Sequence, residues 1–251
     1  MSAWDILLME APRFFTWWNI RFLLEAVGNT LVASVLGCAV GYALGFALAA
    51  LRLPQLVPFG PLRALCILWV EIFRRIPFLV LLLLVFFLAQ FAKLEAPLWV
   101  VAVAAVAIRM SALAAENIRA GLESVRATQW EAALTMNMNP WRVLGAVVLP
   151  QAWRVILPPS IAHVLSMVKE TSLVSQIGFI EITFAAKMLT QRGFSALLTY
   201  GSALVLYFVV GWALATLGRW AERKLTRRPA GPGAPTRSPA SPPAASPLPA
   251  P

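Results

Sequence analysis

Charged residues, histidine and cysteine are all scarce in this sequence, and each shortage excludes a class of protein. Only 13% of the 251 residues are charged, whereas 60% are hydrophobic, and the mean hydropathy is +0.75. An ordinary soluble domain carries about 25% charged residues. The composition therefore excludes a soluble globular domain and indicates a protein embedded in a membrane.

The few cysteines and the single histidine suggest no metal or disulfide chemistry. Cys38 and Cys66 lie far apart, in or beside apolar runs, which favours neither a disulfide framework nor a metal-ligand set. We expect His163, alone in an apolar segment, to be a hydrogen-bonded helix residue. The sequence has no glycine-rich phosphate loop and no nucleophile elbow. It therefore predicts no cofactor on this chain, no hydrolysis of ATP by it and no enzyme.

Five apolar runs have about the length that a membrane-spanning helix needs, roughly 20 residues. They cover residues 26–51, 76–92, 97–115, 160–180 and 193–218. The fold class predicted from them is all-α and integral to the membrane, with five transmembrane helices. Gly37, Gly41 and Gly45 recur every four residues in the first run, which predicts a smooth face for close helix packing.

The two ends of the chain differ from this core of residues 26–228. Residues 1–25 mix aromatic and charged side chains, which predicts an interfacial lead-in on the outer side. Residues 229–251 are almost all Pro, Ala, Ser and Gly, a composition that predicts a disordered cytoplasmic tail. Within the core, residues 65–73 predict a short helix that ends before a break at Arg74-Arg75-Ile76-Pro77.

A polar stretch at residues 128–159 predicts a helix, a tight corner and a second helix. Thr128 and Glu131 stand three residues apart, the spacing of a capping box. Asn137 falls where the first helix needs a left-handed residue, a conformation that Asn tolerates. Asn139-Pro140 then supplies an N-cap and a first helical residue, and we expect Pro150 to end the second helix.

This stretch resembles the EAA loop of bacterial ABC importer permeases. That loop reads Glu-Ala-Ala, three residues, Gly, nine residues, then an aliphatic-x-Leu-Pro. Here the matching residues are Glu131-Ala132-Ala133, Asn137 in the Gly position, and Val147-Val148-Leu149-Pro150. The resemblance implies a cytoplasmic coupling helix that docks into a groove of an ATPase subunit.

The resemblance assigns this coupling to Thr128, Glu131, Ala132, Ala133 and Asn137. The alanines would keep the helix slim enough for a groove, and Glu131 would offer its charge to the partner. The alternative is that Glu131 only caps its own helix.

Two more segments resemble the polar amino acid permeases of this kind. Residues 69–80 are similar to the entry of their second helix, with Arg75-Ile76 where that family has Gly-Thr, and residues 168–174 are similar to their Lys-Asp-Thr-Ser-Leu element. The resemblance implies a type I importer permease for glutamate, aspartate, glutamine or a basic amino acid. It also implies a second permease subunit, identical or paralogous, two cytosolic ABC ATPases that use ATP, an extracytoplasmic binding protein, and surrounding lipid.

Basic residues indicate how the chain is oriented. With the EAA loop cytoplasmic, the inner segments hold fifteen of the 21 Lys and Arg residues: four in 52–75, five in 109–154 and six in 219–251. This bias predicts a multi-pass protein of the bacterial inner membrane, with the N-terminus outside and the C-terminus in the cytoplasm. Because the charges flank the spans, the net charge of +10 does not indicate a nucleic-acid partner.

Charges inside apolar runs are costly and need a reason. Lys169 and Glu170 have no opposite charge four residues away on a helix, and Arg109 is the only charge in its run. Lys169 and Glu170 could form interhelix ion pairs, for instance with Glu71 or Arg74, or could line a translocation path. The path residues proposed on this basis are Glu71, Arg74, Lys169, Glu170, Thr171 and Ser172.

Two other functions use the same composition. A channel or secondary carrier would move its solute without an ATPase-docking loop, and a membrane enzyme would need a clustered catalytic set that the sequence does not offer.

Overall fold

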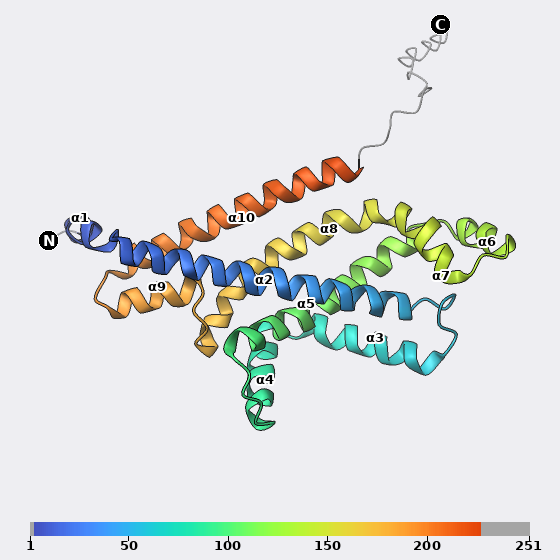
Figure 1. Cartoon of the computed structure of the whole chain (residues 1–251), viewed down its shortest axis with the longest axis horizontal. Coiled ribbons are helices and arrows are strands. Elements are labelled where there is room, and N and C mark those ends of the chain that lie inside the picture. The colour runs from blue at the N-terminus through green and yellow to red at the C-terminus, as the bar shows by residue number, and fades with distance from the viewer. Residues whose placement is uncertain (1–2, 227–251) are drawn as a thin grey trace, which may run out of the picture.

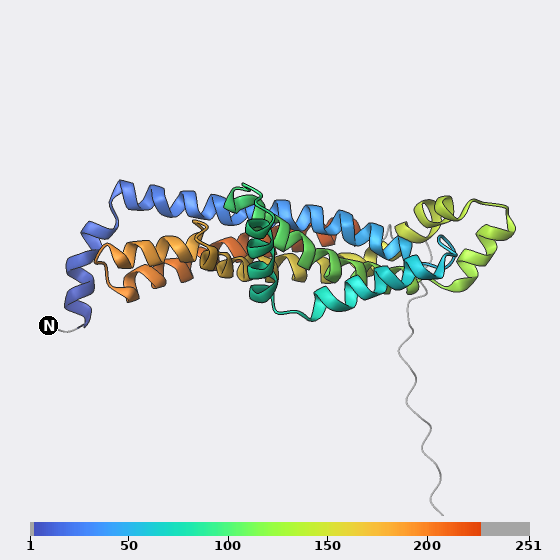
Figure 2. The same cartoon turned by 90° about the horizontal axis from the view of Figure 1, so that it is seen from below.

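Most of the chain forms helices that run side by side along one axis, as Figures 1 and 2 show from two directions. The structure, a computed structural model, describes residues 3–226, and every regular element in that range is a helix. The long helices are α2 (Trp17–Leu51), α5 (Leu98–Glu123), α8 (Leu149–Glu170) and α10 (Ala196–Thr226). The shorter ones are α1 (Ala3–Phe14), α3 (Gly60–Arg75), α4 (Phe78–Phe91), α6 (Ala127–Thr135), α7 (Pro140–Val143), a π-helical turn η1 (Leu144–Val148), a 3-10 helix η2 (Thr171–Ile177) and α9 (Ile182–Gln191).

The centre of the fold is the seam between α2 and α5. A Cβ atom on Gly41 would lie 2.5 Å from Cβ of Met110 and 2.9 Å from the carbonyl oxygen of Ala107, and one on Gly45 would lie 2.6 Å from Cβ of Ala114. Real Cβ atoms do not approach so closely, so only glycine fits this seam. The predicted packing face of small residues is confirmed.

Four helical stretches in the described range are long and apolar enough to cross a membrane. They are α2, α5, the continuous helix from Pro140 to Ile177, and α10. The pair α3 and α4 gives a fifth span only if the two helices together count as one broken crossing, because they meet at 113°. With that reading, the five-span prediction agrees with the structure.

The apolar run at residues 76–92 does not cross as a span of its own, because it counts as a crossing only together with α3. Its helix, α4, has only 14 residues and lies across the other helices (Figure 1). The bend has a local cause, since Pro77 disfavours a helical conformation in the residue before it, and Ile76 is extended, with φ −73° and ψ 133°. The break was predicted at this point, but α3 runs through Arg75 and not only to Phe73.

Pro150 does not end the second helix of the polar stretch, as the sequence had suggested. The chain stays helical because the π-helical turn η1 precedes it, and the backbone N–H of Leu149 reaches the carbonyl oxygen of Leu144, five residues back. Pro150 then lies in the first turn of α8, where a missing N–H costs little. The fourth crossing is therefore helical from Pro140 and not only from residue 160.

The two ends of the chain also differ from the predicted boundaries. Residues 17–25 of the predicted lead-in belong to α2, where Arg21 and Glu25 pair at 2.8 Å one turn apart. Helix α1 turns across the end of the bundle (Figure 2), and Glu10 Oε2 accepts a hydrogen bond of 2.8 Å from the N–H of Ser195, just before α10. The predicted disordered tail, 229–251, lies outside the described residues.

Candidate functional site

Helices α6 and α7 form a protruding loop at the end of the bundle opposite α1 (Figure 1). Helix α6 (Ala127–Thr135) begins two residues earlier than the predicted capping box requires, because its N-cap is Arg126 and not Thr128, and Arg126 makes no side-chain capping bond. Thr128 is already inside the helix and forms no capping box with Glu131. The predicted capping box is therefore wrong, and with it the alternative that Glu131 serves only as a cap.

The corner between α6 and α7 follows the sequence prediction. Asn137 has a positive φ of 57°, in the left-handed region. Asn139 caps α7, because its Oδ1 accepts a hydrogen bond of 2.9 Å from the N–H of Trp141, and Pro140 is the first residue of the helix. Asparagine thus makes the tight corner at the position where the resemblance expects glycine.

The two faces of α6 have different surroundings. Ala133 is only 5% exposed and packs with Trp130 in the core cluster under the loop, whereas Glu131 and Ala132 are exposed. Ala133 therefore does not present a slim face to a partner, because its side chain is packed inside the chain. For Ala132, which is exposed, the slim-helix interpretation stays a prediction. On the same loop, the large apolar side chains of Met136, 77% exposed, and Trp141, 51% exposed, are also open to the outside, and sequence reasoning missed them.

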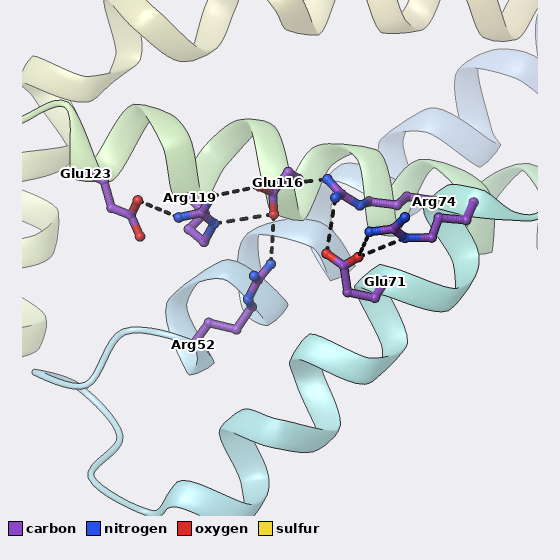
Figure 3. Close-up of polar contacts among 7 residues, drawn as sticks. Arg52, Glu71, Arg74, Glu116, Arg119 and Glu123 are labelled. Atoms are coloured by element: carbon purple, nitrogen blue, oxygen red, sulfur yellow. Dashed lines mark hydrogen bonds and ion pairs between the residues drawn. The ribbon is translucent and has the colours of Figure 1, made fainter.

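A second polar centre lies where α2, α3 and α5 meet, and Figure 3 shows its contacts. Glu116 of α5 pairs with Arg119 at 2.6 Å, with Arg52 just after α2 at 3.1 Å, and with Arg74 of α3 at 3.9 Å. Arg119 also pairs with Glu123. One carboxylate thus joins three segments of the chain.

On α3 the same centre continues outward. Glu71 pairs with Arg74 at 3.2 Å and with Arg75 at 2.6 Å (Figure 3). The Arg75 side chain is 70% exposed. These charges therefore lie on an open face of α3 and not inside the helix bundle.

Arg109 fixes the depth of this centre in the membrane. Its Nη1 donates to the carbonyl oxygens of Phe73 at 2.9 Å and of Ile76 at 3.4 Å, at the free end of α3. Met110, the next residue, packs on Gly41, which lies ten residues before Leu51, about 15 Å along the helix axis. The end of α3 therefore lies well within the apolar run of α2, where unpaired carbonyl groups have no water to bind.

Comparison with known proteins identifies this architecture. Residues 41–230 match the family model described as the binding-protein-dependent transport system inner membrane component. The match covers most of the chain. The chain belongs to this family.

Individual relatives agree with the family match. The permease is 32% identical over 199 residues to the L-cystine transport system permease protein TcyB of Bacillus subtilis (strain 168), a match that covers 79% of this chain and 84% of TcyB. It is 33% identical over 239 residues to the octopine transport system permease protein OccM of Rhizobium meliloti, covering 88% and 95% of the two chains.

Solved structures show the same fold. A crystal structure of an amino acid ABC transporter with histidines matches the permease with a TM-score of 0.75 and 28% identity, over 89% of this chain and 100% of that one. An inward-facing structure of the MetNI methionine ABC transporter matches with a TM-score of 0.74 and 19% identity, over 85% and 100% of the chains. The predicted fold class, an all-α membrane permease of the ABC importer type, is confirmed.

The remaining predicted path residues of the permease lie where α8 passes into η2. Within the described residues Lys169 and Glu170 form no ion pair with Glu71 or Arg74, and Glu170 accepts only a long bond of 3.4 Å from Ser166. Glu71 and Arg74 pair with each other instead. Lys169 is exposed and Glu170 half-buried.

Thr171 and Ser172 follow them at the start of η2. The Thr171 side chain is buried, donates to the carbonyl oxygen of Val168 at 2.7 Å and meets the hydroxyl of Ser34 at 3.4 Å. It joins α2 to η2 and does not face outward, whereas Ser172 is half-buried.

Sequence reasoning missed Glu116 as the centre of the charge cluster, and the reason is geometric. Arg52 directly follows one apolar run and Glu116 directly follows another, so each residue taken alone is typical of a membrane interface. A signal exists in the sequence, since Glu116, Arg119 and Glu123 stand at helical spacing. Their link to Arg52 and Arg74 appears only when α2, α3 and α5 are packed.

Proposed function

We propose that the permease carries a polar amino acid, or a close derivative of one, into a bacterial cell as part of an ATP-driven importer. The observation that carries the proposal is the exposed α6–α7 loop at one end of a bundle of membrane-spanning helices. The relatives named for L-cystine and for octopine support the choice of substrate class, because both solutes carry an amino acid group. This chain binds no cofactor in the proposal, and the ATP is used by separate ATPase subunits.

The α6–α7 loop is the ATPase-docking surface in this proposal. Glu131 and Ala132 present a charge and a slim helix face, and Met136 and Trp141 add apolar side chains beside them. Exposed apolar side chains next to a polar helix are typical of protein–protein contact sites. Thr128 and Asn137 contribute by shaping the helix and the corner, and Ala133 anchors the loop from below.

The translocation path runs along the open face of α3 in the proposal. Glu71 and Arg74 lie at a depth where charge facing lipid is costly, so this face meets water, solute or a second permease subunit. Lys169, Glu170 and Ser172 extend the polar lining towards the outer half. Thr171, which is buried, is left out.

The importer needs partners that complete the path and drive it. A second permease subunit, identical or paralogous, encloses the path, two cytosolic ATPases dock on the two coupling loops, and an extracytoplasmic binding protein delivers the solute. ATP-driven movement of α6 and α7 shifts the attached spans between two openings. The N-terminus is outside and the α6–α7 loop inside, as the basic residues favour.

Uptake by reconstituted vesicles tests the function. Vesicles that contain the permease, its ATPases and its binding protein should import radiolabelled L-glutamine, L-arginine or L-cystine only when ATP is present on the side of the membrane where the ATPases lie. Vesicles with the permease alone should import none of them. If the permease alone took up solute without ATP, the protein would instead be a channel or a secondary carrier.

A pair of neighbouring substitutions tests the docking surface. Ala132→Trp places a bulky side chain on the exposed face, so we expect it to abolish copurification of the ATPase and uptake without changing the thermal stability of the permease. Ala133→Trp overfills the core under the loop, where overpacking costs about 1–3 kcal/mol, so it should lower thermal stability as well. Normal copurification and uptake with Ala132→Trp would contradict the docking assignment.

A further inference from the structure

A polar groove lies at the base of the α6–α7 loop, between the end of α5 and the start of α8. Its volume is about 440 Å³. Two of the side chains that line it are guanidinium groups, from Arg126, the residue just before α6, and from Arg154, in the second turn of α8. Among the described residues that line the groove, none is a carboxylate. The lining itself therefore carries two positive charges.

Both of these charges are uncompensated. Arg126 and Arg154 are exposed, and in the described part of the chain neither forms an ion pair. The carboxylate nearest to Arg126 along the chain, that of Glu123, pairs with Arg119 instead. The arginines of the Glu116 centre, by contrast, are all paired. An anion in the groove therefore meets two free guanidinium groups from different segments of the chain.

Two neutral polar side chains also line the groove. Ser124 Oγ donates to the carbonyl oxygen of Gly121 at 2.6 Å, and Gln151 Nε2 donates to that of Val147 at 2.8 Å. These donors are used within the chain, whereas both side-chain oxygen atoms can still accept a hydrogen bond. The groove therefore suits an anion that also carries a hydroxyl group.

The groove lies at the boundary of the apolar layer. Gly121 of α5, which packs on Ile156 of α8, is seven residues beyond Ala114, about 10 Å along the helix. Ala114 packs on Gly45, which lies six residues before Leu51, about 9 Å along α2. Because α2 and α5 run in the same direction along their seam, Gly121 is level with Leu51, where α2 ends.

From this boundary the lining becomes apolar towards the membrane. Val155 lies one turn further into the span than Gln151 and is 48% exposed, and Val125 adds a second apolar side chain. Trp153, on the same turn of α8 as Val155, is 41% exposed, and tryptophan is enriched at the level of lipid headgroups. The groove is thus polar where headgroups lie and apolar where acyl chains begin.

We propose that this groove binds an anionic phospholipid, with its phosphodiester between Arg126 and Arg154 and its headgroup hydroxyl near Gln151. Basic pockets between transmembrane helices on the cytoplasmic side bind anionic headgroups, and the planar guanidinium matches phosphate oxygens bidentately. The first part of an acyl chain lies along Val155. The bound lipid joins the residue before α6 to α8, at the base of the α6–α7 loop. The proposal goes beyond the proposed function and does not depend on which solute the permease carries.

Lipid binding to the full-length permease tests the site. The delipidated permease is titrated in a neutral detergent with phosphatidylglycerol, with phosphatidylcholine of the same acyl chains, and with the chain-free headgroup glycerophosphoglycerol. Native mass spectrometry counts the first bound molecule. Phosphatidylglycerol should bind about tenfold or more tightly than phosphatidylcholine, the effect of one charge-assisted hydrogen bond. The chain-free headgroup should bind far more weakly than the lipid, since it makes no contact with Val125 and Val155.

Substitutions of the two arginines locate the lipid. Arg126→Gln and Arg154→Gln should each raise the dissociation constant for phosphatidylglycerol about tenfold or more and leave that for phosphatidylcholine unchanged. Arg154→Lys keeps the charge but not the planar fork, so it should restore part of the affinity. The matched control is Arg142→Gln, which removes an exposed arginine of α7 that does not line the groove, and it should change the affinity far less.

Thermal unfolding provides a second measurement. Because both groove arginines are exposed and neither forms an ion pair within the described chain, the double variant with Arg126→Gln and Arg154→Gln should melt like the wild type when no lipid is added. Phosphatidylglycerol should raise the melting temperature of the wild type and of Arg142→Gln, and should raise that of the double variant much less.

Four results would overturn the proposal. They are equal binding of the two lipids, equal losses with Arg142→Gln and the groove variants, and binding of the chain-free headgroup as tight as that of the lipid, which would make the groove a site for a soluble phosphate. The fourth is a loss of ATPase copurification in the groove variants with unchanged binding of phosphatidylglycerol, which would assign the groove to acidic side chains of the ATPase. The uptake test of the proposed function is independent of all four.

Discussion

Arg109 illustrates how a single charge is retained inside a membrane span. The residue lies on α5 at the level of Gly41. At this depth in the apolar layer, backbone groups have no water as a hydrogen-bond partner. Its guanidinium binds two carbonyl oxygens that α3 leaves free when the chain bends at Ile76 and Pro77. The carbonyl groups at the bend need a hydrogen-bond donor, and the buried guanidinium needs acceptors. The contact therefore lowers the cost of the bend and the cost of the charge together.

Replacing Arg109 with methionine should separate insertion from folding. Insertion should not suffer, because an arginine at the centre of a span costs about 2.5–3.5 kcal/mol on insertion scales. Stability should fall, by about 1.5–3 kcal/mol for the loss of one hydrogen bond from a charged donor. The measurements are the membrane-inserted fraction and the thermal unfolding of the purified permease.

The control for that variant is Arg109→Lys, which keeps a donor near the two carbonyl groups and should recover part of the stability. Wild-type unfolding of Arg109→Met would show that α3 does not depend on this contact.

Residues could be predicted from the sequence where their role is local. Asn137 and Asn139 were placed correctly, because a left-handed corner and an N-cap depend on a few adjacent residues. Ala133 and His163 were not. Whether Ala133 faces a partner or the core depends on Trp130 and the helices under the loop. The Nδ1 of His163 is buried and lacks the expected hydrogen bond within residues 3–226, which depends on how α8 packs on α5.

At the scale of elements, the α2–α5 seam holds the fold together. Three glycines of α2 lie against Val106, Met110 and Ala114 of α5, and the two helices approach too closely for any side chain between them. This could be read from the four-residue spacing of the glycines. The contrast between the seam and the rest of α2 allows a direct test.

Gly41→Leu should force α2 and α5 apart, because even its Cβ would lie 2.5 Å from Met110 and 2.9 Å from a backbone oxygen that cannot turn away. We expect a loss of at least about 1–3 kcal/mol of unfolding free energy, the usual cost of overpacking. Gly28→Leu on the same helix is the matched control, since no atom lies within 4 Å of a Cβ there. Thermal unfolding of the two variants checks the difference, and equal melting of both would contradict the role of the seam.

The bends between elements were harder to predict than the elements. The break at Ile76-Pro77 was visible in the sequence, but its 113° angle was not, because the angle depends on contacts of α3 and α4 with α5. The prediction that Pro150 ends a helix failed for a related reason. A proline usually marks a helix end, and the π-helical turn that lets the helix continue has no clear sequence signal.

At the scale of the whole molecule, the bundle has two unlike ends. One carries α1, with Glu10 at the start of α10, and the other carries the α6–α7 loop (Figure 1). The distribution of basic residues in the sequence predicts which end lies on which side of the membrane. The arrangement of the helices alone does not distinguish the two orientations. The orientation therefore stays a prediction that needs a chemical test.

Two exposed methionines, one at each end, provide that test. Met9 on α1 is 67% exposed and Met136 after α6 is 77% exposed, so a cysteine at either place should react readily with a maleimide. Each is introduced in a variant with Cys38 and Cys66 replaced by alanine, and intact spheroplasts are treated with a membrane-impermeant maleimide.

We expect Met9→Cys to be labelled from outside and Met136→Cys only after the membrane is permeabilised, because the distribution of basic residues favours a cytoplasmic α6–α7 end. Binding of the ATPases should then slow the labelling of Met136→Cys in permeabilised cells and leave that of Met9→Cys unchanged. The opposite labelling pattern in intact spheroplasts would invert the orientation, and it would place the α6–α7 loop where no cytosolic ATPase could reach it.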